Sequence, residues 1–258
     1  MPVGVCALCL EKKELRNSHI IPEFMYVNIY DKDPKRFYSL SIKEENIESG
    51  KSRIEQKGIR EYLLCDACEG KFSKYEKYAD ETIFGKNNNG KAIITNSYET
   101  PNQRFFLHDC VGFNYPNFKL FLLSLIWRLG LSKKFALSIE DNILEDLRNT
   151  LLNDNPLNYN DYPCFVQSIL YEKKKKVGGF ILNPYVTNLS QDIKIVNILI
   201  DGFMYSFHMG KNCTAKADEY FLREDGTMKI IGRIVFDDDG LMKMLKLSYD
   251  FFNTIKAR

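Results

Sequence analysis

The chain lacks the features that mark secreted and membrane-spanning proteins. Its most apolar stretch, from Phe118 to Leu131, is interrupted by Lys119 and Arg128 and is too short to span a bilayer. The first residues, MPVGVCALC, contain neither a basic leader nor a long apolar run, so we expect no signal peptide. These absences predict a protein that makes no use of a membrane.

An excess of charge of either sign is also missing. The net charge is +2, and the first 85 residues carry nearly equal numbers of basic and acidic side chains. Non-specific binding of nucleic acid usually requires a clear excess of lysine and arginine. Any contact with nucleic acid must therefore depend on a local patch of basic residues.

What the chain does contain is typical of a globular protein, with 45% hydrophobic and 27% charged residues. Seven cysteines are present. Without a secretory signal, paired cysteines are more often metal ligands than disulfides, because the cytoplasm keeps thiols reduced. The expected location is therefore the cytoplasm.

A boundary between two units is predicted at GKNNNGK, Gly85 to Lys91, because glycine and asparagine favour turns and offer nothing to bury. Residues 1–85 form the first predicted unit. Residues 91–258 form the second, which we expect to bind, to sense or to form homo-oligomers.

The second unit is predicted to be an α+β domain with a mainly antiparallel sheet. An apolar helix is expected from Asn117 to Phe135, and a second helix is expected to start at Ser138, with Asp141 completing a capping box. A last helix is expected from about Leu241 to Ile255. Strands are expected at Cys164 to Tyr171, Gly179 to Leu182, Ile193 to Met209 and Met228 to Phe236.

Two CxxC pairs, Cys6 with Cys9 and Cys65 with Cys68, dominate the first unit. Two such pairs can supply four thiolates to one tetrahedral zinc ion, which has no open coordination position and is therefore structural. The alternatives are reduced cysteines in a core or a redox-active CxxC. Aromatic residues at near-helical spacing follow Cys68, so a helix is expected to begin at the second pair, in the layout of a treble clef.

The segment SHIIP, from Ser18 to Pro22, lies between the two pairs. Together with CALC and LLCDACE it resembles the zinc-containing HNH, or ββα-metal, nuclease family, and the resemblance covers roughly residues 1–85. It implies that His19 is the general base for hydrolysis of a phosphodiester and that Pro22 fixes the turn after the strand.

The resemblance also indicates where a catalytic Mg²⁺ or Mn²⁺ would bind. Ser18 stands where the family has an acidic or histidine ligand, and Glu69 stands where it has a second histidine ligand. Glu61 and Glu76 are further carboxylates that could help. The asparagine expected before Leu64 is replaced by the stretch GIREYLL.

Two functions are therefore predicted for the chain. One is an HNH-like nucleic-acid-binding protein and metal-dependent endonuclease acting on DNA or RNA, with His19 and Glu69 as catalytic residues and, by analogy with the family, a role in bacterial defence against phage. The other is a catalytically inactive, zinc-stabilised adaptor that binds nucleic acid or protein. The predicted nucleic-acid contacts lie among aromatic residues between the cysteine pairs: Arg36, Arg53, Lys57 and Arg60.

Overall fold

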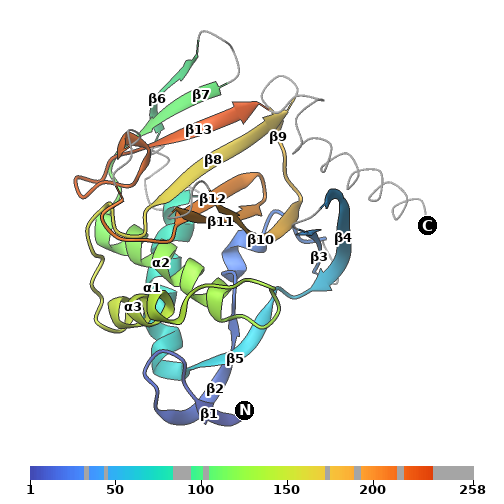
Figure 1. Ribbon diagram of the computed structural model, residues 1–258, viewed down its shortest axis with the longest axis vertical. Coiled ribbons are helices and arrows are strands. Elements are labelled where there is room, and N and C mark those ends of the chain that lie inside the picture. Colours follow the sequence, from blue (N-terminus) through green and yellow to red (C-terminus); the bar gives the residue numbers. More distant parts are fainter. Residues whose placement is uncertain are drawn as a thin grey trace.

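The computed structural model has an α+β fold, as predicted, with two β-sheets and the helices α1, α2 and α3 (Figure 1). It describes residues 1–31, 35–43, 46–83, 94–100, 105–171, 175–188, 193–213 and 218–234. The main hydrophobic core contains residues from both sheets and from all three of these helices, including Leu64, Phe72, Trp127, Leu147 and Val196.

The smaller sheet lies near the N-terminus and leads directly into a helix (Figure 1). Its strand order is β1-β2-β5, with β1 at Val3–Val5, β2 at Lys12–His19 and β5 at Arg60–Cys65, and both pairings are antiparallel. β5 continues into α1, which spans Asp66–Ile83. The helix predicted to begin at the second cysteine pair is thus confirmed.

The larger sheet has ten strands in the described part of the chain, in the order β4-β3-β10-β11-β12-β8-β13-β7-β6, with β9 paired to β8. The pairs β3–β10 and β8–β13 are parallel and the others are antiparallel, so the sheet is mixed. Its strands are β3 (Arg36–Lys43), β4 (Asn46–Gln56), β6 (Ile94–Glu99), β7 (Phe105–Cys110), β8 (Cys164–Tyr171), β9 (Lys175–Lys176), β10 (Phe180–Asn188), β11 (Lys194–Ile200), β12 (Phe203–His208) and β13 (Met228–Ile234).

Strands β3 and β4 belong to the larger sheet, although they lie in the sequence between β2 and β5 of the smaller sheet. They lie in the sequence between the cysteine pairs, yet β3 pairs with β10, so that Phe180 stands opposite Tyr38. The segment between the cysteine pairs therefore contributes to both sheets. The predicted boundary at Gly85 to Lys91 lies outside the described residues, and the division of the chain into two units stays a prediction.

Helix α2, at Tyr115–Leu131, corresponds to the predicted apolar helix but starts and ends earlier. It starts at Tyr115 because the side chain of Asn114 caps it by accepting a hydrogen bond from the amide of Asn117, and it ends where Ser132 turns to an extended conformation. Nearly every side chain from Phe118 to Leu129 is buried. Among the described helices, none is both long enough and apolar enough to cross a bilayer.

The predicted capping box at Ser138 is wrong. Helix α3 spans Asp141–Leu152, its N-cap position is occupied by Glu140, and no side chain provides a capping hydrogen bond. The carbonyl of Ser138 instead accepts a hydrogen bond from Lys194 at 2.9 Å, and Glu140 forms an ion pair with the same ammonium group. This long-range contact replaces a local cap.

The predicted run from Ile193 to Met209 is two strands, β11 and β12, joined by Asp201 and Gly202. Both residues have positive φ, 45° and 79°, which is the conformation of a two-residue hairpin turn of type I′. The dipeptide Asp-Gly was the available signal for this turn. The predicted strand Cys164 to Tyr171 has the same bounds as β8, whereas the last predicted helix lies outside the described residues.

A four-cysteine centre and the His19 site

The four cysteines of the two CxxC pairs meet at one point. Cys6 and Cys9 lie in the turn between β1 and β2, Cys65 ends β5, and Cys68 lies in the first turn of α1. Their sulfur atoms all lie within 4.8 Å of one another, and Cys9 Sγ is 3.9 Å from Cys65 Sγ. Four thiolates at about 2.3 Å from one tetrahedral zinc are roughly 3.8 Å apart. The cluster could therefore hold a metal ion such as zinc.

Backbone geometry in the first turn aims these sulfurs at one another. The amide of Cys6 donates to the carbonyl of Glu11, and the amide of Leu10, a residue with φ of 60°, donates back to the carbonyl of Cys6. The amide of Cys65 donates to Cys6 Sγ at 3.3 Å. Although burial would raise the pKa of Cys6, backbone amides of Cys9, Cys65 and Leu8 lower it to about 7. Burial and the neighbouring cysteines raise the pKa of Cys9 and Cys68, as expected where several thiols crowd together.

His19 is the last residue of β2 and stands directly opposite Arg60 on β5. Its Nε2 atom is buried and lies 2.6 Å from Oε2 of Glu23. This contact is an ion pair only when His19 is protonated, because a neutral imidazole carries no net charge. Glu23 begins the short 3-10 helix η1 (Glu23–Tyr26), and no pattern in the sequence indicated its place in this site.

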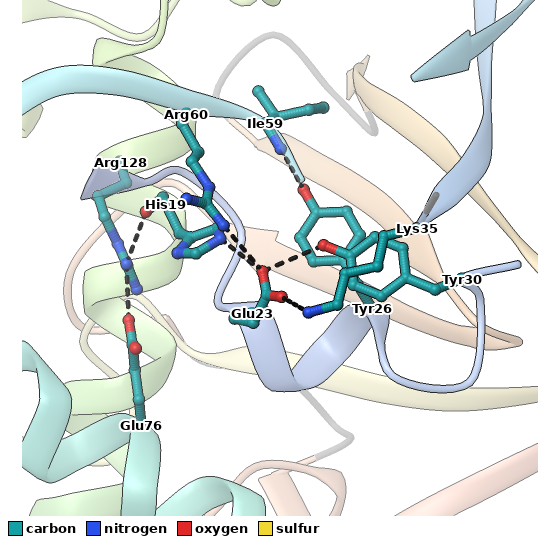
Figure 2. A network of polar contacts seen from close by, with 9 residues as sticks. All are labelled: His19, Glu23, Tyr26, Tyr30, Lys35, Ile59, Arg60, Glu76 and Arg128. Atoms are coloured by element: carbon teal, nitrogen blue, oxygen red, sulfur yellow. Dashed lines mark hydrogen bonds and ion pairs between the residues drawn. The ribbon is translucent and has the colours of Figure 1, made fainter. Parts of the chain in front are cut away.

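The carboxylate of Glu23 gathers several polar groups around His19, as Figure 2 shows. Lys35 donates to it at 3.1 Å, the hydroxyl of Tyr30 donates to it at 3.1 Å, and Arg60 approaches it at 3.5 Å. Burial would raise the pKa of Glu23, but these neighbours, with His19, lower it. Glu23 is therefore ionised at neutral pH and holds the surrounding cations in place.

Burial lowers the pKa of His19 below its ordinary value of 6.5, and the positive charge of Arg60 lowers it further, while Glu23 acts in the opposite direction. The imidazole is therefore neutral at pH 7. A neutral imidazole next to a carboxylate can accept a proton, because the carboxylate stabilises the imidazolium ion that forms.

Arg128 supports the main chain of His19 from the opposite side. Its guanidinium group donates to the carbonyl of His19 at 2.9 Å and forms an ion pair with Glu76 at 2.7 Å (Figure 2). It also bonds to Ser124 on α2 and lies 5.3 Å from the centre of the Phe72 ring. An arginine inside an otherwise apolar helix was the sequence signal for such a role.

Ser18 and Glu69, which stand at the two family positions for metal ligands, do lie together. The hydroxyl of Ser18 donates to Oε2 of Glu69 at 2.6 Å and accepts a hydrogen bond from the amide of Leu64. Burial raises the pKa of Glu69, an effect that the hydrogen bond from Ser18 and the charge of Arg128 partly offset. Glu69 is hydrogen-bonded to Ser18, whereas the carboxylate that contacts His19 is that of Glu23.

These side chains do not fit a hydrolytic Mg²⁺ or Mn²⁺ ion. Such an ion requires several oxygen ligands at once. Here each nearby carboxylate is already engaged: Glu69 by Ser18, Glu76 by Arg128, and Glu23 by Lys35 and Arg60. The buried guanidinium group of Arg128, whose charge acts on Glu69, would also repel a divalent ion.

The predicted nucleic-acid residues do not share one face. Arg36 pairs across the β3–β4 hairpin with Gln56, and Arg53 pairs with Ser39, so the alternation of side chains places Arg36 and Arg53 on opposite faces. Lys57 follows β4 with φ of 60°, and Arg60 lies beside His19. Arg36 is bound by Asp31 at 3.2 Å. Of the four residues, Arg60 belongs to the His19 site.

Comparison with known proteins gives no assignment. No protein-family model, curated protein or solved structure matches the chain, so its function has to be inferred from the arrangement of its own side chains.

Proposed function

We propose that this chain is a zinc-stabilised, HNH-like protein that binds nucleic acid, with the His19 site in contact with the phosphodiester backbone. The observation that carries this proposal is the convergence of His19, Arg60 and Lys35 on the carboxylate of Glu23. Arg60 and Lys35 remain partly exposed, at 34% and 59%. A phosphate group can take contacts from both cations, since Glu23 offsets only one of their two positive charges.

The four-cysteine cluster supports this proposal because it joins the strands that carry His19 and Arg60 to helix α1. We propose that the metal is zinc and that the turn with Cys6 and Cys9, strands β2 and β5, and helix α1 form a treble clef. The metal then fixes the two strands that carry His19 and Arg60 relative to the helix that carries Glu69 and Glu76. The absence of a disulfide among these four cysteines also supports a cytoplasmic location.

Endonuclease activity is the second candidate function, and the neutral imidazole of His19 favours it. In that role His19 would accept a proton from the attacking water, while Arg60 and Lys35 would offset charge on the phosphate. The poor fit of the carboxylates to Mg²⁺ or Mn²⁺ argues for binding without metal-dependent cleavage. If the protein binds nucleic acid and does not cleave it, it is the inactive adaptor.

Binding is tested by fluorescence anisotropy with labelled single-stranded RNA and double-stranded DNA at several salt concentrations. The double variant Lys35→Gln with Arg60→Gln is expected to weaken binding by about tenfold and to reduce its salt dependence, because two phosphate contacts are lost. Lys77→Gln is the matched control, since Lys77 is 77% exposed on α1. Equal loss in the control, or no loss in the double variant, would contradict the proposed site.

Cleavage is tested separately with plasmid DNA and RNA, with and without Mg²⁺ or Mn²⁺, using the wild-type protein and His19→Ala. Cleavage that requires the ion and disappears in His19→Ala would establish the endonuclease. Binding without cleavage would show that the protein is a nucleic-acid-binding adaptor and not an endonuclease. Binding of neither nucleic acid by a folded, metal-loaded protein would overturn the proposed function.

A further inference from the structure

A pocket of about 280 Å³ lies on the large sheet, and no residue of the His19 site lines it. Its lining residues alternate along the strands with residues of the main core. On β11, Ile195 and Asn197 line the pocket, whereas Val196 and Ile198 pack into the core that contains the helices. The pocket therefore opens on the sheet face that turns away from the helices.

A row of hydrogen-bonded side chains forms part of the pocket wall. The hydroxyl of Ser206 donates to Oδ1 of Asn197 at 2.7 Å, and Nδ2 of Asn197 donates to the hydroxyl of Thr187 at 3.0 Å. Asn197 and Ser206 are only 7% and 6% exposed. Asn197 stands opposite Ser206 on β12, and it reaches Thr187 diagonally, because its direct partner on β10 is Tyr185. The row is thus held by three neighbouring strands, β10, β11 and β12.

Three other lining side chains are polar and have no hydrogen-bond partner within the described part of the chain: Gln167, Tyr185 and His208. Each is partly buried. None of their polar atoms is among the described side-chain atoms that are both buried and unpaired, so these atoms remain accessible to a molecule in the pocket. Their convergence on one pocket indicates a ligand that carries both donors and acceptors.

Charge and shape restrict this ligand further. The lining residues include Arg233 and no carboxylate, so the pocket favours neutral or anionic molecules over cations. Burial lowers the pKa of His208, so its ring is neutral at pH 7 and offers both a hydrogen-bond donor and an acceptor. Phe165 supplies an aromatic wall and is held at 5.7 Å, edge to face, by Tyr220. His208 is held in the same way by Phe221 at 5.6 Å. Rings fixed in this way favour a flat ligand.

We propose that this pocket binds one small planar heteroaromatic molecule, of the size and chemistry of a nucleoside or mononucleotide. The volume is near the lower limit for small-molecule sites, which suits a single base with its sugar. The amide of Gln167 offers a donor and an acceptor to the edge of the base, and Thr187 contributes to the polar side. This proposal is independent of the function proposed for the His19 site.

Isothermal titration calorimetry with AMP, GMP, CMP, UMP and the matching nucleosides tests it. At least one of these probes is expected to bind with a stoichiometry of one. Gln167→Leu is expected to weaken that binding by about tenfold, because a hydrogen-bonding amide is replaced by an apolar group of similar size. Thr187→Val provides a second substitution that preserves shape, and the same direction of change is expected.

Gln56→Leu is the matched control, because Gln56 is exposed on β4 and does not line the pocket. This variant and His19→Ala are both expected to bind the probe like the wild type. No saturable binding of any probe at concentrations up to about 1 mM would overturn the proposal. Unchanged affinity in both Gln167→Leu and Thr187→Val would do the same, and neither result would bear on nucleic-acid binding at His19.

Discussion

The guanidinium group of Arg128 and the main-chain carbonyl of His19 are hydrogen-bonded at 2.9 Å, although 109 residues separate them in the sequence. Arg128 is 1% exposed, and it also pairs with Glu76 on α1. One buried charge thus joins helix α2, helix α1 and the end of strand β2. The position of the His19 imidazole therefore depends on the contacts of Arg128 with the His19 carbonyl and with Glu76.

Arg128→Met is therefore expected to destabilise the protein by about 3 kcal/mol, because it leaves Glu76 and the His19 carbonyl without their partner. Urea unfolding at fixed zinc concentration measures the change. Arg36→Met is the control, since Arg36 is 46% exposed and pairs with Asp31 at the surface, where about 0.5 kcal/mol is expected. Similar losses in both variants would contradict a special role for Arg128.

Gly58 allows the ring of His19 to occupy its position. Its φ is +74°, and an added Cβ would lie 3.0 Å from His19 Cδ2 and 3.2 Å from the hydroxyl of Tyr30. Gly58→Ala is expected to cost about 1 to 2 kcal/mol from backbone strain and crowding. Gly70→Ala, inside α1 with nothing within 4 Å, is expected to stabilise the protein by about 0.5 to 1 kcal/mol.

Thermal unfolding measures both changes: the melting temperature is expected to fall in Gly58→Ala and to rise in Gly70→Ala. A stabilising effect of Gly58→Ala would show that the backbone at residue 58 differs from the structure. In nucleic-acid binding, Gly58→Ala is expected to behave like a variant of the His19 site, whereas Gly70→Ala is expected to bind like the wild type.

Cys65→Ser is expected to abolish the bound metal, because one of four ligands is lost and the remaining three cannot close a structural site. The zinc content of the purified protein, measured by elemental analysis, should fall from about one ion per chain to none, and the protein should lose stability markedly. Cys213→Ser serves as the control, because Cys213 lies outside the cluster and bonds to the carbonyl of Gly210. Full zinc content in Cys65→Ser would exclude the four-cysteine site.

Stability is expected to fall as the pH is lowered below 6.5. Burial lowers the pKa of His19, His108 and His208 in the folded protein. The unfolded chain therefore binds protons more tightly at these positions, and the stabilisation present above pH 6.5 is lost as the pH falls through the folded pKa values. Glu69, whose pKa is raised, opposes this trend at a lower pH.

Urea unfolding at about pH 7.5 and about pH 5.5 measures this loss. His19→Asn is expected to reduce the pH dependence, because one of the three histidines is removed. Nuclear magnetic resonance should show the His19 ring titrating below 6.5 in the folded protein. A titration midpoint above that value would mean that Glu23 outweighs burial and Arg60.

Local patterns were sufficient to predict part of the fold. The meeting of the two CxxC pairs, the helix α1 that begins at the second pair, the apolar helix α2 and the strand β8 are all present. Each depends on residues that are close in sequence, such as the spacing within a pair or the run of apolar side chains. The Asp201-Gly202 turn was a local signal that went unused.

The amino-acid sequence by itself determined that two cysteine pairs could meet in one four-thiol cluster and that His19 lies in the segment between them, because the spacing within CxxC and the SHIIP segment are local properties. Only the tertiary structure decided which groups surround that histidine. Arg60 reaches it through the register of β2 and β5, and Arg128 reaches its carbonyl through the packing of α2. Lys35 belongs to the same group because it binds Glu23. Strand register and helix packing join distant residues, and neither can be read from the spacing of residues along the chain.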